Sequence, residues 1–189
     1  AVGQEAFGTN TTGSYNVAIG YNALKLSQTA ANNSAMGYNS LTANTTGYEN
    51  TALGSNSMLI NTEGYRNTAV GYGTLDANTT GDNHVAIGYS ASGANTTASD
   101  NVAVGAYSLN LNETGHNLVA IGVNTLDANT TGTHNVGVGP HANGSGTTGA
   151  NNTALGVNTL MHNITGSSTT AVGAGALTGV AANSASNNT

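Results

Sequence analysis

The stretch NVAIGYNAL, from Asn16 to Leu24, recurs along the chain with small edits. It returns as NTALGSNSM, NTAVGYGTL, NVAVGAYSL and NTALGVNTL, which begin at Asn50, Asn67, Asn101 and Asn152. Each copy joins a small residue and an aliphatic residue to a following Gly. Because versions of this one phrase fill most of the sequence, their spacing decides the fold.

The Gly that ends each Ala-aliphatic-Gly phrase returns every 17 residues, without insertion or deletion. A period this strict indicates a solenoid or repeat array, and 17 residues are too few for a helical hairpin repeat, which needs about 33. We therefore expect one repeat array over residues 1–177 and a degenerate repeat or tail over residues 178–189. The periodic glycines are Gly3, Gly20, Gly37, Gly54, Gly71, Gly88, Gly105, Gly122, Gly139, Gly156 and Gly173.

Positions within one repeat are numbered here from the Asn of NTTG, which places the periodic Gly at position eleven. Position nine is Ala in all copies but one, position ten is always aliphatic, and position fifteen is mostly Leu. The β-branched core predicts a strand with positions eight and ten on one face and nine on the other. We expect a second strand over positions thirteen to fifteen. Gly at eleven supplies a positive φ or a close backbone approach, and NTTG supplies the other turn.

These elements predict an all-β protein, a parallel β-solenoid (β-roll) of eleven 17-residue coils stacked about 4.8 Å apart. Charged residues make up 5% of the chain, against about 25% in typical soluble domains. Stacking explains this composition, because a column of like charges repels itself whereas Asn and Thr columns form hydrogen bonds along the axis.

Composition also limits the partners that the chain can have. Lys25 and Arg66 are the only cations, so neither nucleic acid nor an anionic membrane surface is an expected partner. The chain has no Cys, which leaves no disulfide or Cys-based metal site. No apolar run approaches the ~20 residues that span a membrane, so this segment is not expected to insert into one.

The apolar interior of one coil is thin. Two or three sizeable side chains are each worth about 1.5–3 kcal/mol when buried, whereas ordering the backbone costs about 1–2 kcal/mol per residue. We expect position-ten residues such as Ile19 to form a core that neighbouring chains complete. A parallel homo-oligomer, most simply a homotrimer, or a higher fibre would provide that burial, and end-to-end stacking into a filament stays open.

The phrases NVAIGYNAL, HVAIGYSAS and LVAIGVNTL resemble the head repeats of trimeric autotransporter adhesins. The pattern TGxxNTAxGxxAL is also similar to repeats in tail-fibre-like surface proteins of bacteria and phages. The adhesin coil is usually shorter than 17 residues, so this chain departs from it in the NTTG turn. The resemblance covers residues 1–177 and implies a trimeric, left-handed parallel β-roll.

Seven N-x-S/T sequons place their Asn at position one, a turn that we expect to face solvent. They are candidate N-glycosylation sites that would coat the fibre with glycan. Alternatively, Asn suits the turn and Thr suits the stacked column, so that repetition alone produces the sequons. The seven residues are Asn10, Asn44, Asn78, Asn95, Asn112, Asn129 and Asn163.

Four tyrosines share position twelve, directly after the periodic Gly: Tyr21, Tyr38, Tyr72 and Tyr89. This candidate contact column could bind sugar rings or a receptor, or it could pack against stacked neighbours or an adjoining chain. The five His occupy different coil positions and the eight acids are scattered. We therefore expect no metal site, no cofactor and no catalytic carboxylate pair.

Together these features favour a non-catalytic structural shaft segment of an extracellular fibre or filament, at a cell or virion surface. The alternative is an adhesin head that binds host or environmental glycans or matrix.

Overall fold

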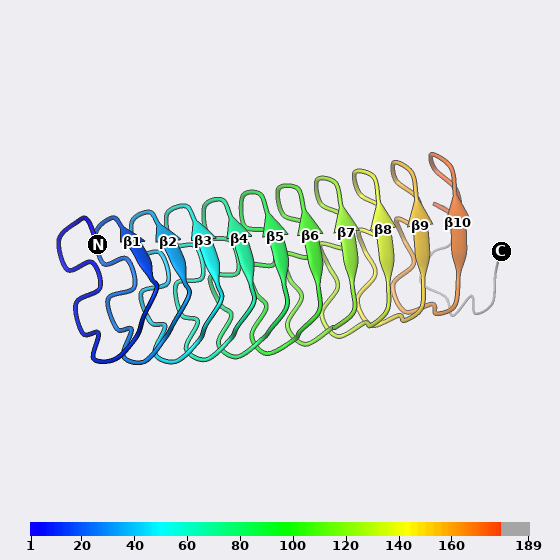
Figure 1. The fold of residues 1–189 in the computed structure, drawn as a ribbon. Coiled ribbons are helices and arrows are strands. Elements are labelled where there is room, and N and C mark those ends of the chain that lie inside the picture. Colours follow the sequence, from blue (N-terminus) through cyan, green and yellow to red (C-terminus); the bar gives the residue numbers. More distant parts are fainter. Residues whose placement is uncertain (179–189) are drawn as a thin grey trace.

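The computed structural model describes residues 1–178, which form one solenoid with ten three-residue strands side by side along its length (Figure 1). The ten strands form a single parallel sheet in chain order, so the predicted all-β parallel β-solenoid with a 17-residue repeat is confirmed. The strands are β1 (Val17–Ile19), β2 (Ser34–Met36), β3 (Thr51–Leu53), β4 (Thr68–Val70), β5 (Val85–Ile87), β6 (Val102–Val104), β7 (Val119–Ile121), β8 (Val136–Val138), β9 (Thr153–Leu155) and β10 (Thr170–Val172).

Each strand pairs in register with its own copy one repeat later. Ala18 lies opposite Ala35, for example, and Ile19 lies opposite Met36. The ten strands mark nine complete turns, fewer than the eleven coils expected from the periodic glycines, and the partial copy at residues 1–3 adds only an isolated bridge between Val2 and Ile19. Of the expected tail, residues 179–189 lie outside the described residues.

The alternation within each strand places Ala, not the aliphatic residue, inside the coil. Ala18 is 1% exposed, whereas its neighbours Val17 and Ile19 are 49% and 36% exposed. The interior facing position nine is narrow, because it is shared with the Leu of position fifteen. The position-ten side chains therefore face outward and form no core within their own chain.

The expected second strand is wrong. Positions twelve to seventeen form consecutive turns, with φ of 55° at Asn22 and 50° at Leu24. The left-handed conformation costs a residue with a Cβ about 1–2 kcal/mol of stability. The Leu24 side chain is fully buried, and that burial offsets the cost. This backbone still pairs with its neighbours, since the Leu24 N–H donates to Ser40 O of the next coil at 3.0 Å. The sequence did not predict a positive φ at position fifteen, because Leu rarely adopts one.

The periodic glycines have positive φ values, between 117° and 144°. Their backbones also approach one another closely, because a Cβ on Gly54 would overlap the carbonyl group of Gly71 in the next coil. Both the conformation and the close stacking exclude a side chain at position eleven.

Candidate functional site

The most extensive candidate surface is the outer face of the sheet, formed by positions eight, ten and twelve, which is called the strand face below. None of the ten charged residues occupies these positions in any coil. Its position-ten side chains are exposed in eight of the ten strands, with Met36 at 48% and Ile121 at 40%, and are partly exposed in β4 and β6. The exposed members of this column are Val2, Ile19, Met36, Leu53, Ile87, Ile121, Val138, Leu155 and Val172.

The four predicted tyrosines supply position twelve of the strand face and form two stacked pairs. The rings of Tyr21 and Tyr38 have centroids 5.4 Å apart, and those of Tyr72 and Tyr89 are 5.3 Å apart. Ser55 occupies the same position in the intervening coil and interrupts the column. All four side chains are between 40% and 53% exposed, so their outer edges can contact a partner or ligand.

The expectation that the position-one asparagines face solvent is wrong. Six of the seven sequon residues are buried, with at most 3% exposed: Asn44, Asn78, Asn95, Asn112, Asn129 and Asn163. Asn10, in the first coil, is partly exposed. The premise of the glycosylation prediction therefore fails at these six positions.

The physical reason is that these side chains close the turn from inside. The Nδ2 of Asn78 donates to Gly81 O of its own turn at 3.0 Å and to Oδ1 of Asn61 in the preceding coil at 2.8 Å. The buried carbonyl of Gly81 is thus satisfied by two amides, since the Nδ2 of Asn67 also donates to it at 2.9 Å. A glycan would replace one of the two hydrogens on Nδ2, so one of these bonds would be lost, and the sugar would need space that the buried side chain does not have.

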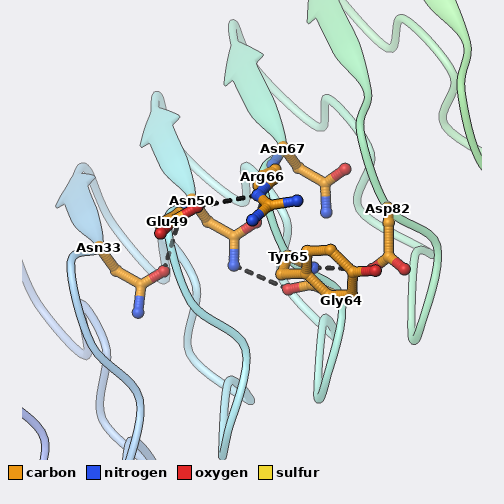
Figure 2. Close-up of polar contacts among 8 residues, drawn as sticks. All are labelled: Asn33, Glu49, Asn50, Gly64, Tyr65, Arg66, Asn67 and Asp82. Carbon is orange, nitrogen blue, oxygen red and sulfur yellow. Dashed lines mark hydrogen bonds and ion pairs between the residues drawn. The ribbon is translucent and has the colours of Figure 1, made fainter.

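A second buried column, at position seven, joins successive coils. The Oδ1 of Asn33 accepts the backbone N–H of Asn50 at 2.9 Å, and the Nδ2 of Asn50 donates to Gly64 O at 2.7 Å (Figure 2). The recurrence of Asn at this position predicted a column of stacked amides. The structure shows that the column is buried and that its amides bond backbone groups of the next coil at the corner before the strand. His84 also belongs to this column, which the sequence analysis did not recognise. The 17-residue spacing places His84 at position seven, where most copies have Asn, and that alignment could have identified it.

Charge gathers at one corner of the coil, at positions five and six near β3 to β5 (Figure 2). Arg66 Nε donates to Glu49 Oε2 at 2.9 Å, and this bond raises the pKa of Arg66. The Tyr65 ring stacks on Tyr48 with centroids 4.8 Å apart. The nearby negative charge of Asp82 raises the pKa of Tyr65. Arg66 and Glu49 are both largely exposed, so the pair contributes little to stability.

Within residues 1–178 no three His, Cys, Asp or Glu side chains are grouped closely enough to hold a metal ion, and no pocket is present. The same residues include no helix that is long and apolar enough to span a bilayer. No protein-family model, curated protein sequence or solved structure matches the chain.

Proposed function

We propose that the chain is a non-catalytic shaft segment of an extracellular fibre at a cell or virion surface, in which identical chains pack through their strand faces. The observation that carries this proposal is the unbroken aliphatic column at position ten of the strand face, which has no charged residue along ten strands. Contiguous exposed apolar patches larger than a few hundred Å² are uncommon on monomers and mark interaction sites.

A second copy of the chain is the partner that this surface fits best. The strand face repeats one aliphatic side chain at every strand spacing, which is about 4.8 Å. An identical rod has the same pitch, so a parallel copy in register can match the pattern at every coil. A globular partner would match it only locally.

The distribution of charge favours the same arrangement. The net charge of −6 comes from residues on the turns, at positions two, three, five, six, thirteen and sixteen. When strand faces meet, these carboxylates stay at the outside, where solvent screens them. Two or more parallel copies could cover the strand faces, and among these assemblies we propose the homotrimer, which the resemblance to trimeric adhesin heads implies.

The mechanical role follows from the bonding between coils. Every coil is joined to the next by strand pairing and, in most coils, by buried Asn side chains. Such a rod resists bending and presents whatever it carries at a fixed distance from its base. Any weak binding site on its surface would be repeated along the fibre, and repeated sites gain avidity.

The test is the native mass of two variants with matched charge changes. Ile121→Glu with Leu155→Glu adds two carboxylates to the strand face, whereas Asn117→Glu with Asn151→Glu adds two at position six, where Glu49 already occurs. We expect the wild type and the position-six variant to have three times the chain mass, and the strand-face variant to be a folded monomer. A folded wild-type monomer at micromolar concentration, or equal masses for the two variants, would refute the assembly.

An adhesin that binds glycans or matrix directly is the second candidate. The exposed edges of the paired tyrosines favour it, because aromatic rings are common platforms for sugars. Tyr72→Ala with Tyr89→Ala should abolish attachment and leave the rod assembled if this function holds. If the chain is a shaft, the same variant should keep attachment and lose assembly strength.

A further inference from the structure

His84 replaces Asn in the buried column at position seven and is 1% exposed. Its backbone N–H donates to Oδ1 of Asn67 in the preceding coil at 2.9 Å, as Asn residues at this position do elsewhere. Its ring reaches the following coil with both nitrogens: Nδ1 accepts the Asn101 N–H at 3.3 Å, and Nε2 lies 2.6 Å from Ala98 O. The imidazole thus reproduces both bonds of an Asn side chain.

These contacts require one neutral tautomer. Ala98 O can only accept a hydrogen bond, so Nε2 must carry the proton, and Asn101 N–H can only donate, so Nδ1 must be bare. A second proton on Nδ1 would point at the Asn101 N–H and break that bond. It would also place a positive charge inside a coil that water does not reach.

The charged groups around the ring are two carboxylates, Asp82 in the same coil and Asp100 in the next, and both raise the pKa of His84. Each already accepts another hydrogen bond, from the Tyr65 N–H and from Asn83 Nδ2 respectively. Burial outweighs them and lowers the pKa of His84 below its ordinary value.

In the preceding coil, the residues beside the column are Tyr65 and Arg66. Arg66 is turned toward Glu49, so its charge is paired on the outer surface. Asn95 Nδ2 lies 3.2 Å from Nε2 and adds another uncharged neighbour. No group in the described coils around His84 therefore forms an ion pair with a protonated ring.

We propose that His84 is an acid-sensitive joint, at which protonation separates the coil of β5 from the coil of β6. The joint lies inside the coil and does not depend on how chains assemble. Asn columns elsewhere in the rod carry no titratable group, so acid would open the rod at this level before it opens others.

The direction with pH follows from linkage. The unfolded chain binds a proton at His84 near pH 6.5, and the folded chain binds it only at lower pH. The stability that His84 provides is therefore complete above pH 6.5 and is lost as the pH falls toward the lowered pKa. Within that window the local opening equilibrium changes by up to about tenfold per pH unit.

The test is amide hydrogen exchange of the full chain at pH 7 and pH 5, expressed as protection factors corrected for intrinsic rates. Asn101 N–H, which bonds His84, is the reporter; Asn67 N–H, which bonds Asn50 Oδ1 at 3.0 Å, is the internal reference. The variants are His84→Asn, which restores the common residue of the column, and His134→Asn, which removes an exposed His.

We expect the wild type and His134→Asn to lose at least tenfold protection at Asn101 on acidification, with Asn67 unchanged. His84→Asn should keep its protection at both pH values. Equal loss at Asn101 and Asn67 in the wild type, or an undiminished loss in His84→Asn, would overturn the proposal. A nitrogen chemical shift showing a proton on Nδ1 at pH 7 would overturn it as well.

Discussion

Asn143, at position fifteen of its coil, occupies the space that a side chain at position one of the next coil, residue 146, would fill. A Cβ on Gly146 would lie 2.5 Å from Oδ1 of Asn143. Elsewhere position fifteen is mostly Leu and the following position one is mostly Asn, so Asn143 replaces a Leu and Gly146 replaces an Asn at this turn. The apolar core divides at this coil: one cluster ends at Leu126 and the next begins at Ala142.

This exchange predicts strong coupling between the two sites. Gly146→Asn alone should destabilise the rod by about 1–3 kcal/mol, because the new side chain overlaps Asn143. Adding Asn143→Leu should remove that penalty and raise stability above the wild type, since a buried Leu replaces an amide whose Oδ1 has no partner. Urea unfolding of the four proteins in a double-mutant cycle should give more than about 1 kcal/mol of interaction energy. Additive effects would show that the two side chains do not compete for one space.

Gly71 and Gly73, two residues apart, should lose very different amounts of stability on the same substitution. Gly71→Asn should cost more than about 3 kcal/mol, because φ is 137° and a Cβ would overlap the Gly88 carbonyl group. Gly73→Asn should change stability by less than about 0.5 kcal/mol, because φ is 57° there and Asn22 adopts nearly the same angle. Thermal unfolding followed by circular dichroism checks both, and similar losses in both variants would contradict the stacking geometry.

The neighbouring residues Asn32 and Asn33 provide a matched test of the buried column. Asn32 is exposed, whereas Asn33 is fully buried and its Nδ2 donates to Gly47 O at 2.9 Å. Asn33→Asp removes that donor and buries a carboxylate, so it should lower the free energy of unfolding by about 3 kcal/mol or more at pH 7. The loss should shrink as acid protonates the new carboxyl group.

Asn32→Asp makes the same chemical change at the surface and should be within about 0.5 kcal/mol of the wild type. Denaturant unfolding at pH 7 and pH 4.5 separates the two variants. A tolerated Asn33→Asp would mean that the amide bonds of the column contribute little.

Glycosylation of the folded protein should occur at sequons whose Asn is exposed and not at sequons whose Asn is buried. Asn32 and Asn151 head sequons at position six, where the side chain is exposed. When the folded protein is treated with a soluble N-glycosyltransferase, peptide mass spectrometry should find glycan at these two residues and none at Asn44 or Asn129. Modification of Asn44 in the folded state would show that the position-one turn opens readily.

The strand placement and register could be predicted from the sequence, because a 17-residue period without insertions allows only one alignment of the copies. The direction of each side chain required more than the period. Ile19 looks like a core residue by hydrophobicity, yet the narrow coil admits only Ala18 beside Leu24. Asn44 looks like a surface turn residue by polarity, yet it is buried because the turn's own carbonyl group needs a donor.

The backbone conformation of positions twelve to seventeen could not be predicted from the hydrophobic pattern either. Leu24 adopts a left-handed conformation that its residue type disfavours, and Ser92 and Asn143 adopt it at the same position, so the stacked turn sets the conformation and burial of the Leu24 side chain offsets its cost. The candidate surface has the same origin, because the narrow coil leaves the aliphatic column of position ten on the outside, where the proposed assembly would cover it.

The proposed assembly through strand faces is tested most directly by crosslinking through a single introduced Cys, since the chain has none. Ile87→Cys places a thiol on the strand face of β5, and Asn83→Cys places one at exposed position six of the same coil. With a short bis-maleimide, a parallel assembly in register predicts efficient crosslinking between copies of residue 87 and little between copies of residue 83. Equal crosslinking at the two positions, or none at residue 87 in the folded protein, would contradict it.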